Sequence, residues 1–349
     1  MRHIGVDLHK TNFVACFLAA ADTQRFETYP LTREGLSRFK RRLRKADEVA
    51  VEATQNVHHF FDQVKAAVGR VRVVDTYRFG VVARSKKKTD KADAAALARS
   101  LKLGWLPEVP VPSEQVRTLR QLSQARETLV SVRTKLKSMA HAAFSRNGVA
   151  PTRAAFASAV SRRRLSKRDD LPASDLLVLR SASRQLEQLD AEVARPEAEI
   201  VSRGKTLRGL KRLLPVHGLN LPSAISLLAE VGDVNLFDTS KQLVAYAGLA
   251  TSTRQSSETT RHGGITERGR KRLRTVCVQA ALAMVNRTDT PLLSFYLKKR
   301  REKGAGKAIC ATARKLLTVI FVLLKKELDY WYLEERLYNR KLRLLNAAA

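Results

Sequence analysis

Four acidic residues in the first hundred positions are placed so that they could share a divalent cation. Asp7 and Glu52 each end a short apolar run that is typical of a buried strand. Asp90 and Asp93 stand in an alanine-rich segment, and on a helix this spacing puts both side chains on one face, with Cβ atoms about 5–6 Å apart. Unpaired carboxylates this close repel one another and take up protons unless a cation neutralises them. The pattern therefore predicts a site for Mg²⁺, with Mn²⁺ as an alternative, at these four carboxylates.

Each of these residues also has a simpler interpretation when it is taken alone. Most acidic side chains are solvated surface groups, and Asp90 suits the start of a helix, where the helix dipole stabilises negative charge. The combination favours the metal site, because two acids that end strands are followed by a helical pair. Two Mg²⁺ ions about 3.5–4 Å apart at such a site could bind the attacking and leaving oxygens of a phosphodiester.

The segments around these acids alternate between strand and helix patterns. The expected strands are 3–8, 12–18, 25–29, 49–52 and 71–74, and the expected helices begin after Thr32, at about 56 and at Thr89. Three strands followed by alternating helices and strands are the element order of the ribonuclease H fold, a mixed sheet flanked by helices. In that fold the first and fourth strands are neighbours and the closing helix packs across their ends, which would bring the four carboxylates together.

The rest of the chain is predicted to be mainly helical. Three prolines between Trp105 and Pro112 indicate a linker. Leucine-rich helices at about 113–146 and 173–203 predict a long helical hairpin or coiled coil, although an ordinary helical core would give the same pattern and Pro196 could kink the second helix. The expected domains are an α/β ribonuclease-H-like domain at 1–104, a linker and coiled-coil region at 105–205, a mainly α-helical domain at 206–335 and a basic C-terminal tail at 336–349.

Two stretches of the mainly helical C-terminal domain suggest function. The turn that contains Gly218 resembles a helix-hairpin-helix, whose backbone amides could hold a DNA phosphate. The polar, glycine-containing stretch Gly248–Gly269 is too long for a passive connection and is a candidate functional loop.

The charge balance indicates a polyanionic partner. Lys and Arg number 65 against 33 Asp and Glu, which gives a formal net charge of +32. Both parts of the chain contribute, with 21 basic and 11 acidic residues before Gly104 and 44 and 22 after it. Such an excess attracts nucleic acid through phosphate neutralisation and counterion release; a ribosomal-type structural protein and a membrane-surface protein are the alternatives. Basic clusters that suit phosphates occur at 40–45, 84–88 and 298–301.

Other features of the sequence concern the compartment. The three cysteines stand alone, without the spacing of a disulfide framework or a zinc site, and suit a reducing cytoplasm. No signal peptide is visible, since Asp7 and Lys10 come early, and the longest apolar stretch, Leu316–Leu324, is shorter than the ~20 residues of a membrane span. We expect a soluble protein in the cytoplasm of a bacterial or archaeal cell, associated with the nucleoid.

Six short motifs, three in each half of the chain, carry a family resemblance. The N-terminal motifs are Asp7-Leu8-His9-Lys10, Val51-Glu52-Ala53 and Thr89-Asp90-Lys91-Ala92-Asp93-Ala94. The C-terminal motifs are Leu227-Leu228-Ala229-Glu230-Val231-Gly232-Asp233, Tyr246-Ala247-Gly248-Leu249-Ala250 and Gly263-Gly264-Ile265-Thr266-Glu267-Arg268-Gly269. In these motifs and their order the chain resembles the DEDD transposases of the IS110 insertion-sequence family. The resemblance implies an N-terminal domain similar to the RuvC Holliday-junction resolvase, a C-terminal transposase domain, and catalytic roles for the four carboxylates.

The resemblance also implies a nucleophile that the residues alone do not indicate. The family has a catalytic serine in the loop after the Tyr-Ala-Gly-Leu segment, and this serine matches Ser256. The chain has Thr251 where the family has proline and Ser257 where it has glycine, so Ser257 is the alternative. A serine in a polar loop is usually a solvated hydroxyl or a turn former, and no nearby His–Asp pair marks a hydrolase triad.

A structured noncoding RNA is a further partner that the resemblance implies. In the family, this guide RNA pairs with donor and target DNA, so the protein has only to hold backbones and shape, as in RNA-guided nucleases. The residues expected to contact nucleic acid are Lys86, Lys87, Lys88, Arg254, Arg261, Arg268 and Lys271. The helical hairpin is expected to mediate self-association, giving a dimer or a tetramer.

Three functions remain open from the sequence. The preferred one is a transposase or recombinase in which Ser256 attacks a DNA phosphodiester beside a metal-bound carboxylate cluster. The second is an endonuclease or junction resolvase in which the same carboxylates activate water. The third is a non-catalytic RNA-binding relative, against which the presence of all four acids argues.

Overall fold

The structure is a computed structural model of the whole chain. It describes residues 1–82, 89–150, 156, 158–167, 170–256, 259–286 and 290–347. The chain divides into two compact units, Met1–Pro112 and Ser113–Ala349. Within the described ranges, none of the helices is both long enough and apolar enough to cross a membrane.

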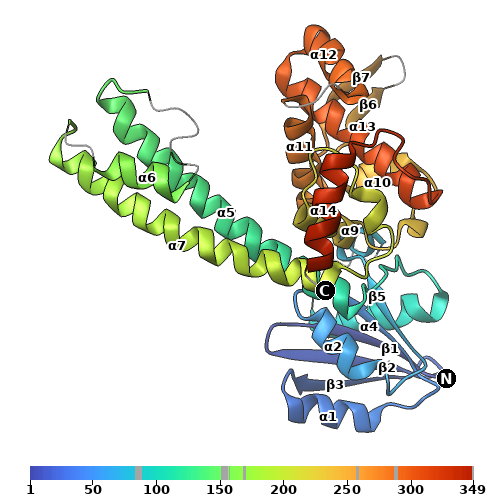
Figure 1. The fold of residues 1–349 in the computed structure, drawn as a ribbon. Helices are drawn as coiled ribbons and strands as arrows, with labels where there is room; N and C mark the ends of the chain where they lie inside the picture. The colour runs from blue at the N-terminus through green and yellow to red at the C-terminus, as the bar shows by residue number, and fades with distance from the viewer. Residues whose placement is uncertain are drawn as a thin grey trace. The chain divides into compact units, whose positions relative to one another are not determined.

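The first unit is a five-stranded mixed sheet flanked by helices (Figure 1). Its elements in chain order are β1 (His3–Leu8), β2 (Asn12–Leu18), β3 (Gln24–Pro30), α1 (Arg33–Arg42), β4 (Glu48–Glu52), α2 (Val57–Val64), β5 (Arg70–Val74), α3 (Thr76–Val82) and α4 (Asp90–Leu103). The strand order is β3-β2-β1-β4-β5, in which β2 is antiparallel to β1 and β3, while β4 is parallel to β1 and β5. The first and fourth strands are therefore neighbours, as predicted.

The alternation of side chains along the strands gives this sheet two separate apolar faces. In β2, Phe13, Ala15 and Phe17 pack with side chains of α1 and α2 in one cluster. The intervening residues of the same strand, Cys16 among them, pack with Ala94 and its neighbours in α4. Successive side chains of a strand point to opposite faces, so α4 covers one face of the sheet and α1 and α2 cover the other.

The proline-containing stretch 105–112, predicted as a linker, is part of the first unit. It runs beside β5, where Val109 N donates a hydrogen bond to Val73 O at 2.7 Å. Val74 and Glu108 form an antiparallel bridge in the same place. The stretch thus covers the edge of β5 and satisfies backbone groups that would otherwise be unpaired.

The second unit is mainly helical and contains one two-stranded sheet. Its elements are α5 (Glu114–Arg146), α6 (Ala159–Ser166), α7 (Ala173–Gly204), α8 (Leu210–Leu213), α9 (Leu221–Val231), the 3₁₀ helix η2 (Val234–Leu236), α10 (Ser240–Tyr246), β6 (Thr251–Ser256), β7 (Thr259–Ile265), α11 (Lys271–Val285), α12 (Pro291–Lys303), α13 (Ala305–Lys325) and α14 (Glu335–Ala347).

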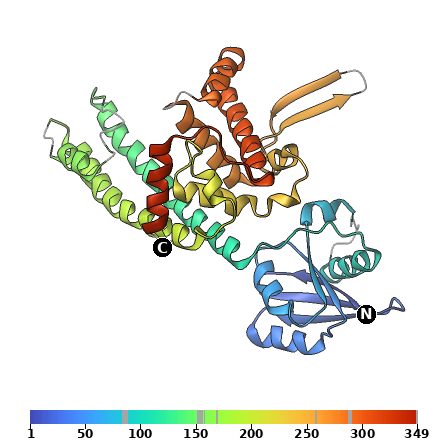
Figure 2. The same ribbon diagram turned by 45° about the vertical axis from the view of Figure 1, so that its right-hand side comes forward.

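Helices α5 and α7 pack along each other as a long hairpin, and they lie side by side in both views (Figures 1 and 2). Helix α7 continues through Pro196. Ion pairs cross the middle of the hairpin, for example Arg126 Nε to Glu197 Oε1 at 2.6 Å. The leucine-rich stripe of α5 does not lie wholly against α7, since Val132 and Met139 are each 41% exposed.

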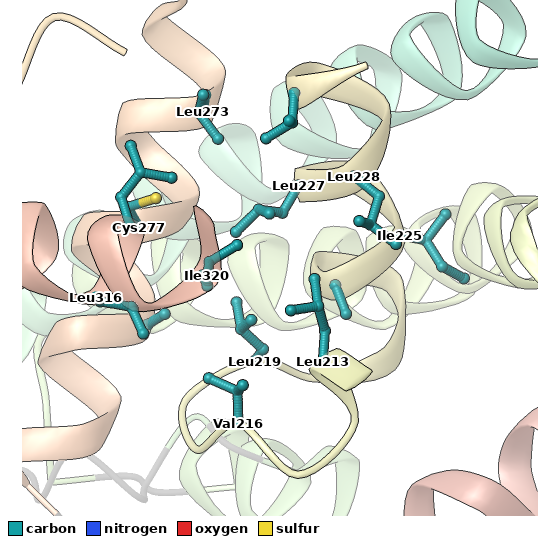
Figure 3. Close-up of a cluster of buried hydrophobic side chains, with 14 of the residues drawn as sticks. Leu213, Val216, Leu219, Ile225, Leu227, Leu228, Leu273, Cys277, Leu316 and Ile320 are labelled. Carbon is teal, nitrogen blue, oxygen red and sulfur yellow. The ribbon is translucent and has the colours of Figure 1, made fainter. Parts of the chain in front are cut away.

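The main core of the second unit is formed by helices from both ends of this part of the chain. Figure 3 shows Leu213, Leu219 and Leu227 directed toward Cys277 and Ile320, although these residues come from distant segments. Leu119 of α5 and Ile200 of α7 belong to the same cluster, so the base of the hairpin is anchored in this core.

Two expectations for the second unit need correction. Val216 and His217 in the turn that resembled a helix-hairpin-helix are buried, and a Cβ at Gly218 would lie 2.2 Å from Ala280 O, so this turn is a packing contact rather than an open phosphate site. The expected tail 336–349 is instead largely helix α14, because its Lys341 and Leu345 are buried against the rest of the unit.

Candidate functional site

Asp7 and Glu52 lie at adjacent positions at one edge of the sheet. They follow Val6 and Val51, which are paired in the parallel register of β1 and β4. Neighbouring parallel strands run toward the same edge, so the register by itself brings these two acids together. The side chain of Asp7 is 15% exposed and therefore largely removed from water.

Helix α4 brings two further carboxylates to Asp7. Thr89 caps this helix, since its side chain accepts a hydrogen bond from the backbone of the first turn, which contains both Asp90 and Asp93. Burial raises the pKa of the Asp7 carboxyl, and the negative charges of Asp90 and Asp93 raise it further. Of the four predicted acids, Asp7 and Asp90 have ligand atoms within 4.8 Å of each other. Asp93 and Glu52 lie outside this group of described ligand atoms, Asp93 one turn along α4 and Glu52 at the end of the adjacent strand.

A glycine makes the close approach of α4 possible. A Cβ at Gly5, in the middle of β1, would lie 2.0 Å from Ala94 O and 2.5 Å from Ala98 N. A side chain at this position would push α4 away from the sheet. The absence of a side chain at Gly5 therefore helps to set the distance between Asp90 and Asp7.

His9 is a member of this cluster that the sequence analysis did not select. Its Nε2 atom lies 3.1 Å from Asp7 Oδ2 and 3.2 Å from Asp90 Oδ2. The only sequence signal was its place two residues after Asp7 in the Asp-Leu-His-Lys motif. A lone histidine beside a strand is too common for that signal to have indicated a role.

The residues present fit a divalent cation. One ligand atom each of Asp7, His9 and Asp90 lies within 4.8 Å of the others. Carboxylate oxygens are the usual ligands of Mg²⁺ and Mn²⁺, and a cation would offset the burial and the neighbouring negative charges that raise the pKa of Asp7. Asp75, which follows β5, is committed elsewhere, because its Oδ1 accepts hydrogen bonds from the backbone N–H groups of Tyr77 and Arg78.

Ser256 lies in the second unit, at the end of β6. The stretch expected to be a polar loop is a β-hairpin in which Ser256 pairs with Thr259 and Arg254 pairs with Arg261. Figure 2 shows β6 and β7 extending as a ribbon beyond the helices of this unit. Ser257, the alternative nucleophile, lies outside the described residues, as do Lys86, Lys87 and Lys88.

The base of this hairpin is held by a network of arginines. Arg274 Nη1 donates hydrogen bonds to Ala247 O at 3.2 Å and Glu267 O at 3.0 Å, on both sides of the hairpin. Arg272 Nη1 lies 2.7 Å from Oε1 of Glu230, a carboxylate that is 1% exposed. The hairpin therefore leaves the helices from a fixed base.

Two of the predicted nucleic-acid contacts lie at this base. Arg268 and Lys271 are both exposed, just before and at the start of α11. Within the part of the chain that the structure describes, neither forms an ion pair with an acidic side chain, in contrast to Arg272, which binds Glu230 and Glu127. Their positions are compatible with contact to a phosphate.

Comparison with protein-family models gives two matches. A model described as a DEDD transposase of the IS110 type matches residues 4–146, and a model described as the transposase IS116/IS110/IS902 family matches residues 210–297. Together they match about two thirds of the chain, and each includes one of the two candidate sites. The chain belongs to the IS110 family of DEDD transposases. It is therefore a DNA transposase or recombinase enzyme encoded by an insertion sequence.

Individual relatives agree with this assignment. A protein of Pseudomonas aeruginosa named "Probable family 20 transposase" is 28% identical over 81% of this chain and 85% of its own length. The "Transposase for insertion sequence element IS1111A" of Coxiella burnetii is 27% identical over 70% of this chain and 68% of its own length. The "Pilin gene-inverting protein" of Moraxella bovis is 24% identical over 93% of this chain and 96% of its own length.

Proposed function

We propose that this IS110-family transposase exchanges DNA strands with two groups of residues, a metal-binding carboxylate cluster and a serine nucleophile. The observation that carries the proposal is the convergence of Asp7 and Asp90, whose ligand atoms lie within 4.8 Å of one another and of His9, with Asp93 in the same helical turn as Asp90 and Glu52 at the end of the neighbouring strand β4. The strand order β3-β2-β1-β4-β5 and the element order support a ribonuclease-H-like, RuvC-like fold for this unit.

The proposed chemistry at Ser256 is a transfer of a phosphoryl group. Its Oγ loses a proton and attacks the phosphorus, the bond to the 3′ oxygen breaks, and that oxygen leaves as a hydroxyl after taking up a proton. The 5′ phosphate then stays on Ser256 as a phosphodiester. The 3′ hydroxyl of another strand attacks this phosphorus, and Oγ leaves and regains a proton. Each exchange breaks one phosphorus–oxygen bond and forms one, so no other reactant is needed.

The carboxylates Asp7, Glu52, Asp90 and Asp93 would hold Mg²⁺, or Mn²⁺ in its place. A bound divalent cation supplies stabilisation of the negative charge that develops on the phosphoryl oxygens. The largely buried Asp7 orients the cluster from the sheet, and the more exposed Asp90 faces it from the start of α4.

The name of one relative supports strand exchange rather than simple hydrolysis. The Moraxella bovis protein is named for inverting a pilin gene, and inversion requires rejoining of DNA ends. A water-dependent nuclease or junction resolvase would use the same carboxylates without Ser256, and remains the second candidate because the cluster alone is typical of such enzymes.

We also propose the partners of this reaction. A structured guide RNA and the donor and target DNA would be held by the basic surface of the chain, for which its net charge of +32 is the support. The predicted contacts are Arg254, Arg261, Arg268 and Lys271, together with Lys86, Lys87 and Lys88. Self-association would use the half-exposed stripe of α5, where Val132 and Met139 are 41% exposed. Such a nucleic-acid-bound enzyme would be cytoplasmic and associated with the nucleoid.

The decisive experiment traps the covalent intermediate. Protein copurified with its RNA is given Mg²⁺ and 3′-labelled DNA that carries the junction of the element, and the products are separated on a denaturing gel. We expect a protease-sensitive protein–DNA adduct with the wild type and with Ser257→Ala, and no adduct or cleavage with Ser256→Ala. Loss of the adduct only in Ser257→Ala would move the nucleophile to that residue. Free cut ends without any adduct would assign the enzyme to the nuclease class.

A further inference from the structure

The environment of His9 is unusual for a surface histidine. Its side chain is 44% exposed, yet the one ring atom Nε2 faces two carboxylate oxygens, at 3.1 Å on Asp7 and 3.2 Å on Asp90. Nε2 carries at most one proton, which it can direct to only one of the two oxygens at a time. The arrangement therefore leaves one of these contacts without a good hydrogen bond.

A metal ion could bind His9 Nε2, Asp7 Oδ2 and Asp90 Oδ2 at the same time. Ligand atoms about 2.0–2.2 Å from one ion and at right angles around it are about 3 Å apart. Both distances from Nε2 agree with that separation, and the three ligand atoms all lie within 4.8 Å of one another. The site thus has the spacing of three ligands of one ion, two oxygens and one nitrogen.

The backbone around His9 is also held in place. His9 N donates a hydrogen bond to Asn12 O at 2.9 Å, which closes the turn between β1 and β2. The side-chain amide of Asn56, in the loop after Glu52, donates to His9 O at 3.4 Å and to Lys10 O at 3.3 Å. The turn is thereby tied to the loop that follows Glu52.

We propose that Nε2 of His9 is a direct ligand of the metal ion bound by Asp7 and Asp90, and that this nitrogen makes the site prefer Mn²⁺ to Mg²⁺. Mg²⁺ is bound mainly through oxygen and demands near-ideal octahedral geometry. Mn²⁺ also takes oxygen ligands, but it is the first member of the transition-metal series whose divalent ions accept nitrogen, so one imidazole ligand costs Mn²⁺ less than it costs Mg²⁺. The inference rests on the proposed carboxylate metal site and adds a fifth side chain to it. It also predicts which cation the site selects when both are present.

The test uses Mn²⁺ alone as the probe, on the full-length protein. Pulsed electron paramagnetic resonance of bound Mn²⁺ detects a coupling to ¹⁴N when an imidazole nitrogen is a direct ligand. We expect this coupling in the wild type and in the control His59→Gln, which alters an exposed histidine of α2, and its loss in His9→Gln. The affinity for Mn²⁺ should fall about tenfold in His9→Gln, while the affinity for Mg²⁺, measured by competition, should change less than about twofold.

Other outcomes overturn the inference in distinguishable ways. If Asp7→Asn abolishes Mn²⁺ binding but the wild type shows no ¹⁴N coupling, the carboxylate site stands and His9 is not a ligand. Persistence of the coupling in His9→Gln has the same consequence. If Asp7→Asn binds Mn²⁺ as the wild type does, the proposed metal site fails together with the inference. Circular dichroism of each variant shows whether it is folded, so a loss of binding through unfolding is recognised.

Discussion

A single hydrogen atom in place of a side chain at Gly5 has consequences for the candidate site. A Cβ at Gly5 would lie 2.0 Å from the backbone atom Ala94 O and 2.5 Å from the backbone atom Ala98 N, both in α4. These are backbone atoms, which cannot turn aside as a flexible side chain can. Because Asp90 and Asp93 belong to the first turn of the same helix, a shift of α4 also moves them relative to Asp7.

We therefore predict that Gly5→Ala loses most of its strand-exchange activity. The added methyl group should also lower the free energy of unfolding by about 1–3 kcal/mol, the usual cost of overpacking a core. The matched control is Gly80→Ala in α3, where a Cβ would meet nothing within 4 Å and alanine favours the helix. Denaturant unfolding and the strand-exchange assay check both variants. Wild-type activity in a fully stable Gly5→Ala would show that the approach of α4 does not determine the site.

The acidic residues that follow the strands are predicted to have two different functions, metal binding and helix capping. Alanine at Asp7, Glu52, Asp90 or Asp93 should abolish strand exchange in Mg²⁺. For Asp7, Asp90 and Asp93 thermal unfolding should stay close to that of the wild type, because the charges of Asp90 and Asp93 repel that of Asp7 and the loss of one of them does not cost stability. Asp75→Ala should instead lower the thermal stability and keep the strand-exchange activity. It removes the cap of α3, at a cost of about 1 kcal/mol, and leaves the metal ligands intact. Full activity in any two of the first four variants would refute the carboxylate site.

How far the sequence predicts this site depends on what each residue shows locally. Asp7 and Glu52 could be selected because each ends an apolar run, and β-strand register then determines their neighbours. Asp75 also follows a strand, but its hydrogen bonds to the start of α3 became visible only in the structure. His9 was missed because its role depends on the distance to Asp90, a residue 81 positions further along the sequence.

At the scale of strands and helices, the spacing of apolar residues along the sequence explains which segments could be predicted. The strands β1 and β2 were predicted with their observed bounds, since both faces of each are apolar and short turns flank them. The hairpin β6–β7 was taken for a loop because its residues, such as Thr251–Ser256, are polar and do not alternate with apolar residues in the sequence. Helix α14 was taken for a tail because its sequence is basic, and only contacts with distant segments bury Lys341.

Helix α14 gives a prediction about pH. Lys341 Nζ donates hydrogen bonds to Leu214 O at 2.7 Å and Val216 O at 3.0 Å, and burial lowers the pKa of Lys341 from 10.5 to about 8. Between these two values the unfolded chain binds more protons than the folded chain, so the free energy of unfolding rises with pH. The gain is at most about 1.4 kcal/mol per pH unit for one proton.

The comparison variant for this titration is Lys341→Met, which keeps the length of the side chain but cannot be protonated. The difference in unfolding free energy, wild type minus variant, should increase between about pH 8 and pH 10.5 and stay constant just below that range. Other groups titrate in both proteins and cancel in the difference. Urea unfolding at several pH values measures it. A difference that is flat or falls with pH would mean that Lys341 is not buried as the structure shows.

At the scale of the whole molecule, the excess of positive charge has no internal partner. Many acidic side chains are already paired, as Glu230 is with Arg272 and Glu302 is with Lys299. Exposed cations such as Arg300 and Arg301 stand between the two members of the second pair in α12. A chain with a net charge of +32 therefore attracts polyanions, and the members of its family are DNA transposases.

Binding to RNA or DNA should consequently weaken steeply as salt is added. Each neutralised phosphate releases condensed counterions, so the slope of log affinity against log salt should be steeper than about −3. Replacing Arg300 and Arg301 together with glutamine should make the slope shallower by about 1–2 if both contact phosphates. Lys65→Gln is the control. Lys65 is paired with Asp62 at 3.1 Å, so its replacement should leave the slope unchanged. Fluorescence anisotropy at several salt concentrations gives all three slopes. A wild-type slope shallower than about −3 would mean that few phosphates are held, and that the charge of this chain serves another purpose.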